Sequence, residues 1–256
     1  MARVERLRVY PVKGLDGVDV DAAEMLTGGT LAGDREYALF DAEGDVINGK
    51  RTERIHELST DFDPRTGDLV VETRAGDRRQ FSLPADRERA EAWFGEFFDV
   101  EATLRRDASL GFVDRREMGP SVVSTATLEA VASWFEEVTV ESARRRLRTN
   151  VEIGGVPAFW EDRFVGDGAP AFEAGGVRFD GVTPCGRCVV PERDPDTGEP
   201  TPEFRERFLE KRRESLPDGV DEAAFEHLYA VTIIADVPES DRGRTIRVGD
   251  AVDVLD

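Results

Sequence analysis

The chain has 256 residues, enough for one large domain or two modest ones with a buried core in each. Aspartate and glutamate total 54 residues against 34 lysine and arginine residues, and the acids behind the formal net charge of −20 are spread along the whole sequence. Such an acidic surface argues against binding to nucleic acid or to an anionic membrane, because both require a basic face.

The composition also indicates the ionic environment and the cellular compartment of the protein. Only three lysines are present, Lys13, Lys50 and Lys211. A dispersed acidic surface with so little lysine predicts a salt-adapted protein, since concentrated salt screens the repulsion between exposed carboxylates. Two cysteines cannot form a disulfide framework, and no apolar run is long enough for a signal core or a membrane span. We therefore expect a cytoplasmic protein.

Short, partly alternating apolar segments dominate the first third of the chain. They predict strands at 4–9, 18–20, 37–40, 46–47, 69–71 and 81–83. The turn sequence at 41–45 is expected to join two of these strands as a hairpin. The period changes at 86–98, where Ala90 and three aromatic residues fall on one face of a helix. That stripe indicates core packing rather than a cofactor site.

The rest of the chain mixes strands with two further helices. Helices are predicted at 127–138 and 202–215, and the second is highly charged and expected to be mostly solvated. The glycine-rich stretch 142–195 is expected to form strands and loops, and closing strands are expected at 231–235 and 246–255. Together these elements predict a mainly β fold with a few short helices, an α+β class built from two β-rich units.

The most informative segment is TPCGRC, from Thr183 to Cys188, which is followed by DPDTG at 194–198. A four-ligand zinc site would need two more donors, and neither His56 nor His227 has ligand-like spacing to the cysteines. A thioredoxin-like pair would need a helix that begins at the first cysteine, which the neighbouring glycine and proline disfavour.

A third interpretation is a single thiolate that acts as a metal ligand. Arg187 adjoins Cys188 in the sequence, and a basic neighbour favours the thiolate form of a cysteine. A thiolate is the soft, charged ligand that a high-valent metal–oxo centre requires.

CGRC followed by DPDTG resembles the signature of MOSC domains, a family that includes the mitochondrial amidoxime-reducing component and its bacterial relatives. Further motifs similar to those of the family occur in the expected order: YPVKG at 10–14, GDR at 33–35, LRTNV at 147–151, FWEDRF at 159–164 and IRVGD at 246–250. The resemblance covers nearly the whole chain. It implies a MOSC amino-terminal β-barrel-like domain at 1–100 and a MOSC β-barrel domain at 101–256.

The resemblance also implies a molybdenum–molybdopterin cofactor, with no pyridoxal phosphate, in the crevice between the two units. In the family the cysteine after the arginine coordinates molybdenum, so Cys188 is the expected metal ligand and catalytic residue. The expected cofactor-binding residues are Lys13, Arg35, Arg148, Asn150, Arg187 and Cys188. Lysine and arginine suit the phosphate that ends the pterin, because they supply charge-assisted hydrogen bonds.

Further residues near these motifs are expected to pack, to line the pocket or to lie at the surface. Cys185 is expected to pack rather than to bind, and the arginines at 144–146 are candidates for part of the pocket. Glu161 and Asp162 have equal claims to a structural and a functional role. Gly14 departs from the serine that relatives commonly have, which removes one hydroxyl. His56 and His227 are expected at the surface or its boundary, and no role is assigned to Tyr229.

The activity implied by the resemblance is an oxidoreductase that reduces N-hydroxylated small molecules. No cysteines remain to hold an iron–sulfur cluster, so electrons are expected from a separate donor protein. One alternative is a sulfur carrier that holds a persulfide on Cys188 and binds no metal. Another is a non-catalytic module that stores or transfers the cofactor.

Overall fold

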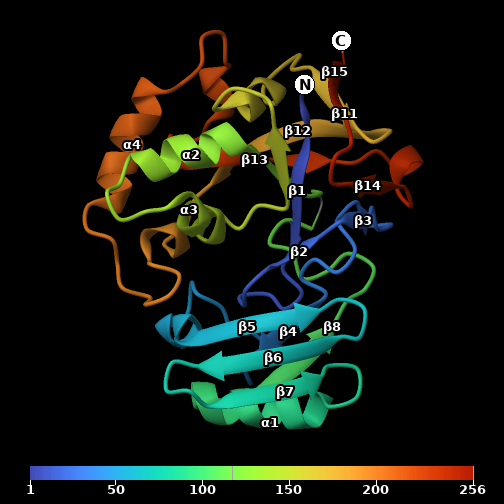
Figure 1. Ribbon diagram of the computed structural model, residues 1–256, viewed down its shortest axis with the longest axis vertical. Coiled ribbons are helices and arrows are strands. Elements are labelled where there is room, and N and C mark those ends of the chain that lie inside the picture. Colours follow the sequence, from blue (N-terminus) through green and yellow to red (C-terminus); the bar gives the residue numbers. More distant parts are fainter. Residues whose placement is uncertain (117, 256) are drawn as a thin grey trace.

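The computed structural model describes residues 1–116 and 118–255. Its larger part is built on an eight-stranded sheet that joins the two ends of the chain (Figure 1). From one edge to the other the strands are β15 (Val252–Leu255), β11 (Ala171–Ala174), β12 (Val177–Gly186), β13 (Ala230–Asp236), β9 (Ser121–Ser124), β10 (Val151–Gly154), β1 (Arg3–Val9) and β2 (Val18–Val20). Neighbours are antiparallel except β9 and β10.

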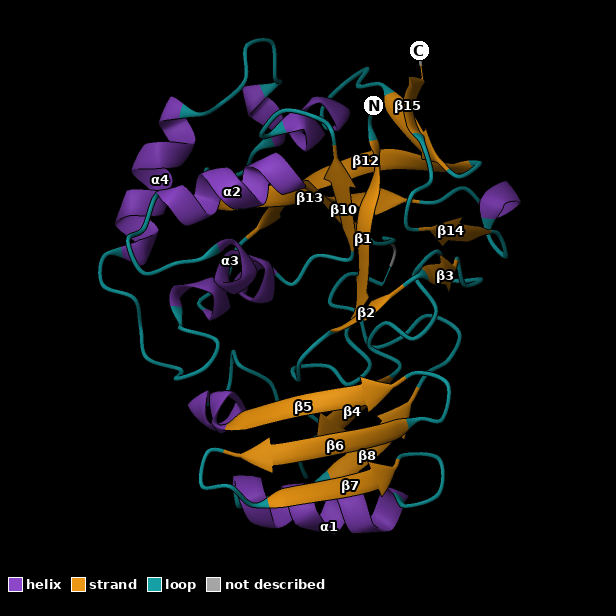
Figure 2. Cartoon of the chain, viewed as in Figure 1, coloured by secondary structure: helices purple, strands orange, loops and turns teal. Residues whose placement is uncertain are grey.

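The parallel pair needs a crossover connection, and two helices supply it. These are α2 (Thr125–Ser133) and α3 (Val140–Leu147). The hydroxyl of Ser124 caps α2 by accepting from the Thr127 N–H at 3.0 Å. A third helix, α4 (Phe204–Glu214), shares an apolar core with both of them, and Figure 2 shows all three gathered beside the large sheet.

A smaller layer forms a second core. It contains β5 (Leu58–Asp63), β6 (Asp68–Thr73), β7 (Arg78–Ser82), helix α1 (Arg87–Phe98) and the ribbon of β4 (Tyr37–Phe40) with β8 (Thr103–Arg106). Figure 1 shows α1 packed along one side of the three-stranded sheet. A last pair joins β3 (Ala22–Glu24) to β14 (Thr245–Arg247). Short 3-10 helices are η1 (Glu53–Glu57), η2 (Trp160–Phe164), η3 (Val190–Glu192), η4 (Glu222–Ala224) and η5 (Glu239–Asp241).

The predicted α+β class is confirmed, as are most of the predicted strands. The expected hairpin exists, although its second arm is only a single bridge between Phe40 and Val46. The closing segment forms two strands rather than one, because the chain turns at Gly249 with a positive φ of 93°. The division of the chain at residue 100 stays a prediction, and β1 contributes to the sheet of the second half.

Two helix predictions were wrong in part. The helix expected at 127–138 ends at Ser133, and α3 lies where strands and loops were expected. Most of helix α4 is exposed, as expected, although Arg212 is fully buried. None of the helices in the described part of the chain has the length and apolar character of a membrane-spanning segment.

Candidate functional site

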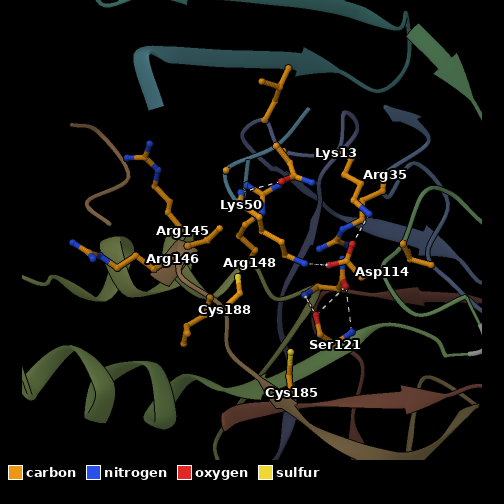
Figure 3. A pocket seen from close by; sticks show the side chains of 18 of the residues that line it. Lys13, Arg35, Lys50, Asp114, Ser121, Arg145, Arg146, Arg148, Cys185 and Cys188 are labelled. Atoms are coloured by element: carbon orange, nitrogen blue, oxygen red, sulfur yellow. Dashed lines mark hydrogen bonds and ion pairs between the residues drawn. The ribbon is translucent and has the colours of Figure 1, made fainter. Parts of the chain in front are cut away.

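A cavity of about 390 Å³ lies where the smaller layer meets the large sheet (Figure 3), a size typical of small-molecule sites. The smaller layer contributes residues 48–50, 55, 56 and 58, and the larger part contributes residues 145–148 and 185–188. All the cofactor-binding residues predicted from the sequence line this cavity, namely Lys13, Arg35, Arg148, Asn150, Arg187 and Cys188.

The cavity concentrates positive charge in an acidic protein. Nine basic residues line it: Lys13, Arg35, Lys50, Arg115, Arg145, Arg146, Arg148, Arg187 and Arg193. The acidic residues that line it are three, Asp16, Asp34 and Asp114. The lining therefore carries a formal excess of six positive charges, whereas the whole chain carries −20. A local field of this sign, opposite to that of the surface, favours an anionic ligand.

Two of these arginines have backbones in the left-handed region. Arg148 has a φ of 53° at the end of α3, where its N–H donates to the Arg144 carbonyl at 3.0 Å. Arg35 has a φ of 52°. Left-handed backbones are uncommon for residues other than glycine and persist where the surroundings impose them, often at functional sites.

Both guanidinium groups lie against one aromatic ring. The guanidinium carbon of Arg148 lies 4.1 Å from the centroid of the Tyr10 ring, and that of Arg35 lies 5.1 Å from it. Arg35 pairs with Asp34. Among the described residues no carboxylate lies within ion-pair distance of Arg148, and burial, with a contribution from Arg35, lowers its pKa. Arg148 thus offers a positive charge that the described part of the protein does not neutralise.

Two lysines meet a single carboxylate on another wall of the cavity. The ammonium of Lys13 lies 2.5 Å from one oxygen of Asp114, and that of Lys50 lies 2.6 Å from the other. Burial lowers the pKa of Lys13, and Asp114 opposes this effect. Burial would raise the pKa of Asp114, but the two lysines outweigh it and hold that pKa well below its usual range. The motifs pointed to Lys13 and missed Lys50 and Asp114.

The two cysteines are free thiols in the same cavity. Cys185 lies near the end of β12, and Cys188 lies in the loop between β12 and η3. Figure 3 shows the Cys188 side chain across the cavity from Lys13 and Asp114. Both residues are partly exposed, so Cys185 is not fully buried. The expectation that Cys185 packs rather than binds stays a prediction.

The side chain of Arg187 does not form a hydrogen bond with Cys188, although the two residues are adjacent in the sequence. Its Nη1 donates to the sulfur of Cys185 at 3.1 Å, and its Nη2 donates to the Leu147 carbonyl at 2.8 Å. The guanidinium therefore binds Cys185 and the carboxyl-terminal end of α3. No cluster of three or more metal-ligating side chains occurs among residues 1–116 and 118–255. A metal in this cavity would thus need ligands from a bound group in addition to those from the protein.

Asn150 serves the framework of the cavity wall. Its side-chain oxygen accepts from the N–H and the hydroxyl of Ser121, at 3.2 and 3.0 Å, and its amide nitrogen donates to the Arg8 carbonyl at 3.2 Å. These bonds tie together the ends of three strands. The predicted cofactor contact of Asn150 stays a prediction.

The DPDTG segment forms a turn that joins the two parts of the molecule. One carboxylate oxygen of Asp194 accepts from the backbone of Asp196 and Thr197, and the other pairs with Arg146 at 3.3 Å. The Asp196 carbonyl accepts from Arg74 of the smaller layer at 2.9 Å. His56 packs against Gly198, lines the cavity, and has its pKa lowered mainly by burial. His227 is exposed.

The buried acids of the FWEDRF motif have structural roles. Asp162 forms an ion pair with Arg212 at 2.6 Å, and both side chains are buried. Glu161 accepts from the Ser124 N–H at 3.2 Å and from the Thr127 hydroxyl at 3.1 Å. Neither acid lines the cavity.

Tyr229 is hydrogen-bonded to the cysteine segment and to η3, a role that the sequence did not predict. Its carbonyl accepts from the Arg187 N–H at 2.8 Å, and its hydroxyl donates to Glu192 at 3.2 Å.

The fold and the cavity define an α+β protein with free thiols in a positively charged cavity. The chain belongs to the MOSC family: residues 1–141 match the MOSC N-terminal beta barrel domain, and residues 117–253 match the MOSC domain. The family resemblance drawn from the motifs is thereby confirmed.

Three similar proteins carry names that bear on function. The chain is 24% identical over 234 residues to mitochondrial amidoxime reducing component 2 of Bos taurus, covering 76% of this chain and 67% of that protein. For the Homo sapiens protein of the same name the identity is 23%, with 76% and 68% covered. For the molybdenum cofactor sulfurase of Solanum lycopersicum it is 23%, with 75% of this chain and 29% of the sulfurase covered.

Proposed function

We propose that this protein binds a molybdenum–pterin cofactor through the thiolate of Cys188 and reduces N-hydroxylated small molecules with electrons from a separate donor protein. Membership of the MOSC family supports the proposal, as do relatives named for amidoxime reduction and for the molybdenum cofactor. The observation that carries it is a free thiol in one cavity with Arg148, a partly buried cation without a carboxylate partner among the described residues.

The residues of the cavity fit the chemistry of this cofactor. A pterin phosphate needs cations, and Lys13 and Arg35 would hold it. The soft thiolate of Cys188 suits a molybdenum ligand. Arg148 is positioned by Tyr10 and by its fixed backbone, so it would bind an anionic part of the cofactor with little reorganisation.

In this proposal the protein binds and orients, while the bound cofactor supplies the two-electron redox chemistry. Removal of a hydroxyl oxygen from nitrogen consumes two electrons and two protons and releases water. Pro195 of the turn at 194–198, together with Ile55 and His56 of η1, lines the cavity and would restrict the access of bulk water. A cytoplasmic location and a small-molecule substrate, with neither nucleic acid nor membrane as partner, belong to the same proposal.

Metal and pterin analysis of protein from a molybdopterin-making host tests the proposal. Wild type and Cys185→Ala should contain about one molybdenum and one pterin per chain, whereas Cys188→Ala should lose at least about tenfold of both. Circular dichroism and the unfolding midpoint establish that the variants are folded. Full molybdenum content in a folded Cys188→Ala protein would overturn the proposal, and so would wild-type protein that lacks both metal and pterin.

A sulfur-carrier function is the second candidate, since Cys188 is a free and partly exposed thiol. Such a carrier would gain the mass of one sulfur atom at Cys188 after incubation with a persulfide donor, and would pass that sulfur to an acceptor thiol. It would contain no stoichiometric molybdenum. Intact-mass spectrometry and metal analysis on the same sample therefore separate the two functions.

A further inference from the structure

The Lys13–Asp114–Lys50 cluster combines rare residues in one place. Two of the only three lysines of the chain meet here on one carboxylate, at 2.5 and 2.6 Å (Figure 3). A lysine ammonium is a compact charge on a flexible stem, so it can exchange one oxyanion for another.

The three side chains reach the cavity from separate segments. Lys13 follows β1, and its backbone is fixed by a hydrogen bond from its N–H to the Tyr37 carbonyl at 2.8 Å. Lys50 lies in the turn after β4, where its N–H donates to the Asn48 side chain at 2.9 Å. Asp114 comes from the segment between β8 and β9. The side chain of Lys13 is only 13% exposed, whereas that of Asp114 is 55% exposed. Asp114 thus reaches onto the lysines from the rim.

The backbone around Asp114 is held on either side of it. The Phe112 N–H donates to the Arg35 carbonyl at 2.8 Å, and the Gly119 N–H donates to the Ala235 carbonyl at 2.7 Å. The exposed carboxylate between these points can turn away from the lysines by side-chain rotation, without displacing either anchored residue.

Another carboxylate of the cavity shows a different arrangement. Asp34 is 3% exposed, accepts from the Tyr10 N–H at 2.9 Å and pairs with Arg35. It is a fixed part of the wall. Asp114 instead forms ion pairs with the ammonium groups of two lysines, in a cavity whose net positive charge attracts anions.

We propose that Asp114 is a built-in counter-ion that competes with the anionic group of the ligand for Lys13 and Lys50, and that Lys50 belongs to the anion-binding site. The ligand group is a phosphate or pyrophosphate ester. The proposal rests on the proposed function only in that a phosphate-bearing cofactor would be the natural ligand. When that ligand binds, the two lysines pass from the carboxylate to the phosphate oxygens, and the segment at 113–116 is released.

Titration calorimetry with inorganic pyrophosphate tests this exchange on the full chain, produced in a host that cannot make molybdopterin. Asp114→Asn keeps the size of the side chain and removes the competing charge, so it should bind pyrophosphate about tenfold more tightly than wild type. Asp16→Asn is the matched control, because it removes a charge from the same cavity but pairs with Arg145 rather than with the lysines. It should change the affinity by no more than about threefold. Adding Lys50→Gln to Asp114→Asn should abolish the gain.

Hydrogen exchange gives a second measurement that does not depend on affinity. Pyrophosphate should accelerate exchange at 113–116 in wild type, and should have little effect there in Asp114→Asn. An Asp114→Asn protein that binds no more tightly than wild type would contradict the proposal, because Asp114 would then position the lysines instead of competing for them. An equal gain in Asp16→Asn would reduce the effect to net charge and would also overturn it. None of these outcomes depends on molybdenum, so failure here and failure of the proposed function are distinguishable.

Discussion

Arg148 and Tyr10 form the closest stacking of a cation on an aromatic ring in the described residues, with 4.1 Å between the guanidinium carbon and the ring centroid. Tyr10 is 1% exposed and also carries Arg35 on its ring at 5.1 Å. The Tyr10 side chain, directly after β1, thus positions two cations of the cavity.

Replacing Tyr10 should therefore weaken anion binding. Tyr10→Leu removes the ring under both arginines, and a contact of this kind is worth about 0.5–1 kcal/mol or more, so pyrophosphate affinity should fall about fivefold. Tyr10→Phe keeps the ring and loses only a long 3.5 Å contact from the hydroxyl to the Thr149 carbonyl, so its affinity should stay within about twofold of wild type. Calorimetry on both variants measures the difference. Equal losses would show that the hydroxyl, not the ring, matters.

Two substitutions of Arg148 distinguish the effect of its charge on anion binding from the effect of its backbone conformation on stability. Arg148→Gly and Arg148→Ala both remove the guanidinium, so both should lose at least about tenfold in pyrophosphate affinity. Only glycine relieves the left-handed backbone, with its φ of 53°, and Arg148→Gly should be about 1 kcal/mol more stable than Arg148→Ala. Urea unfolding of the two proteins checks the second expectation. If the alanine variant is the more stable, the positive φ carries no strain.

Breaking the buried ion pair of Arg212 and Asp162 should lower the stability strongly, and a second substitution should recover part of the loss. Arg212→Met leaves the Asp162 carboxylate buried without its partner and should cost about 3–5 kcal/mol in the free energy of unfolding. Adding Asp162→Asn removes the buried charge and should recover at least half of that loss. Denaturant unfolding at neutral pH gives both values. A double variant no more stable than Arg212→Met would show that packing of the guanidinium on Phe159, rather than the charge pair, dominates.

Glu161 predicts a pH dependence of stability. Burial, followed by the charge of Asp162, raises the pKa of Glu161 from 4.5 to about 8. The folded protein thus binds this proton more tightly than the unfolded chain, and the stabilisation is complete below pH 4.5 and lost as the pH rises through 8. Between those values the loss is about 1.4 kcal/mol per pH unit.

Unfolding midpoints of Glu161→Gln between pH 5 and pH 9 test this expectation. This variant should lack the decline and should be more stable than wild type above pH 8. Glu129→Gln, on the exposed face of α2, is the control and should keep the decline. Parallel curves for wild type and Glu161→Gln would mean that Glu161 is already charged when the protein is folded.

Much of the fold follows from local sequence pattern. Apolar alternation identified β1, β6 and β7 because each has one face against a core. The pattern failed for α3, whose inward side includes Arg144 and Arg146, so that buried charges hide its apolar face. Arg144 is buried because it pairs with Glu152 of the neighbouring strand at 2.7 Å, a partner that only the tertiary structure reveals.

The sequence predicted several residues that line the candidate site, but it did not predict which of them contact one another. Motifs located Lys13 and Cys188, and the cavity contains both. Adjacency in sequence suggested that Arg187 serves Cys188, yet its side chain turns toward Cys185, because neighbouring residues need not share a direction. Asp114 was missed since it is more than sixty residues from either lysine that it contacts. The prediction of a salt-adapted chain stays a prediction.

The pairing of β1 with β10 has a consequence for biosynthesis. β1 is synthesised more than 140 residues before its partner β10, at Val151–Gly154. At about 5–20 residues per second, the edge of β1 that pairs with β10 waits on the order of ten seconds for its partner, while β2 can pair with the other edge at once. The small layer can form its own core in that interval, while the large sheet must close after it. During synthesis, the edge of β1 that β10 later covers therefore stays open to other partners until the residues up to β10 have been made.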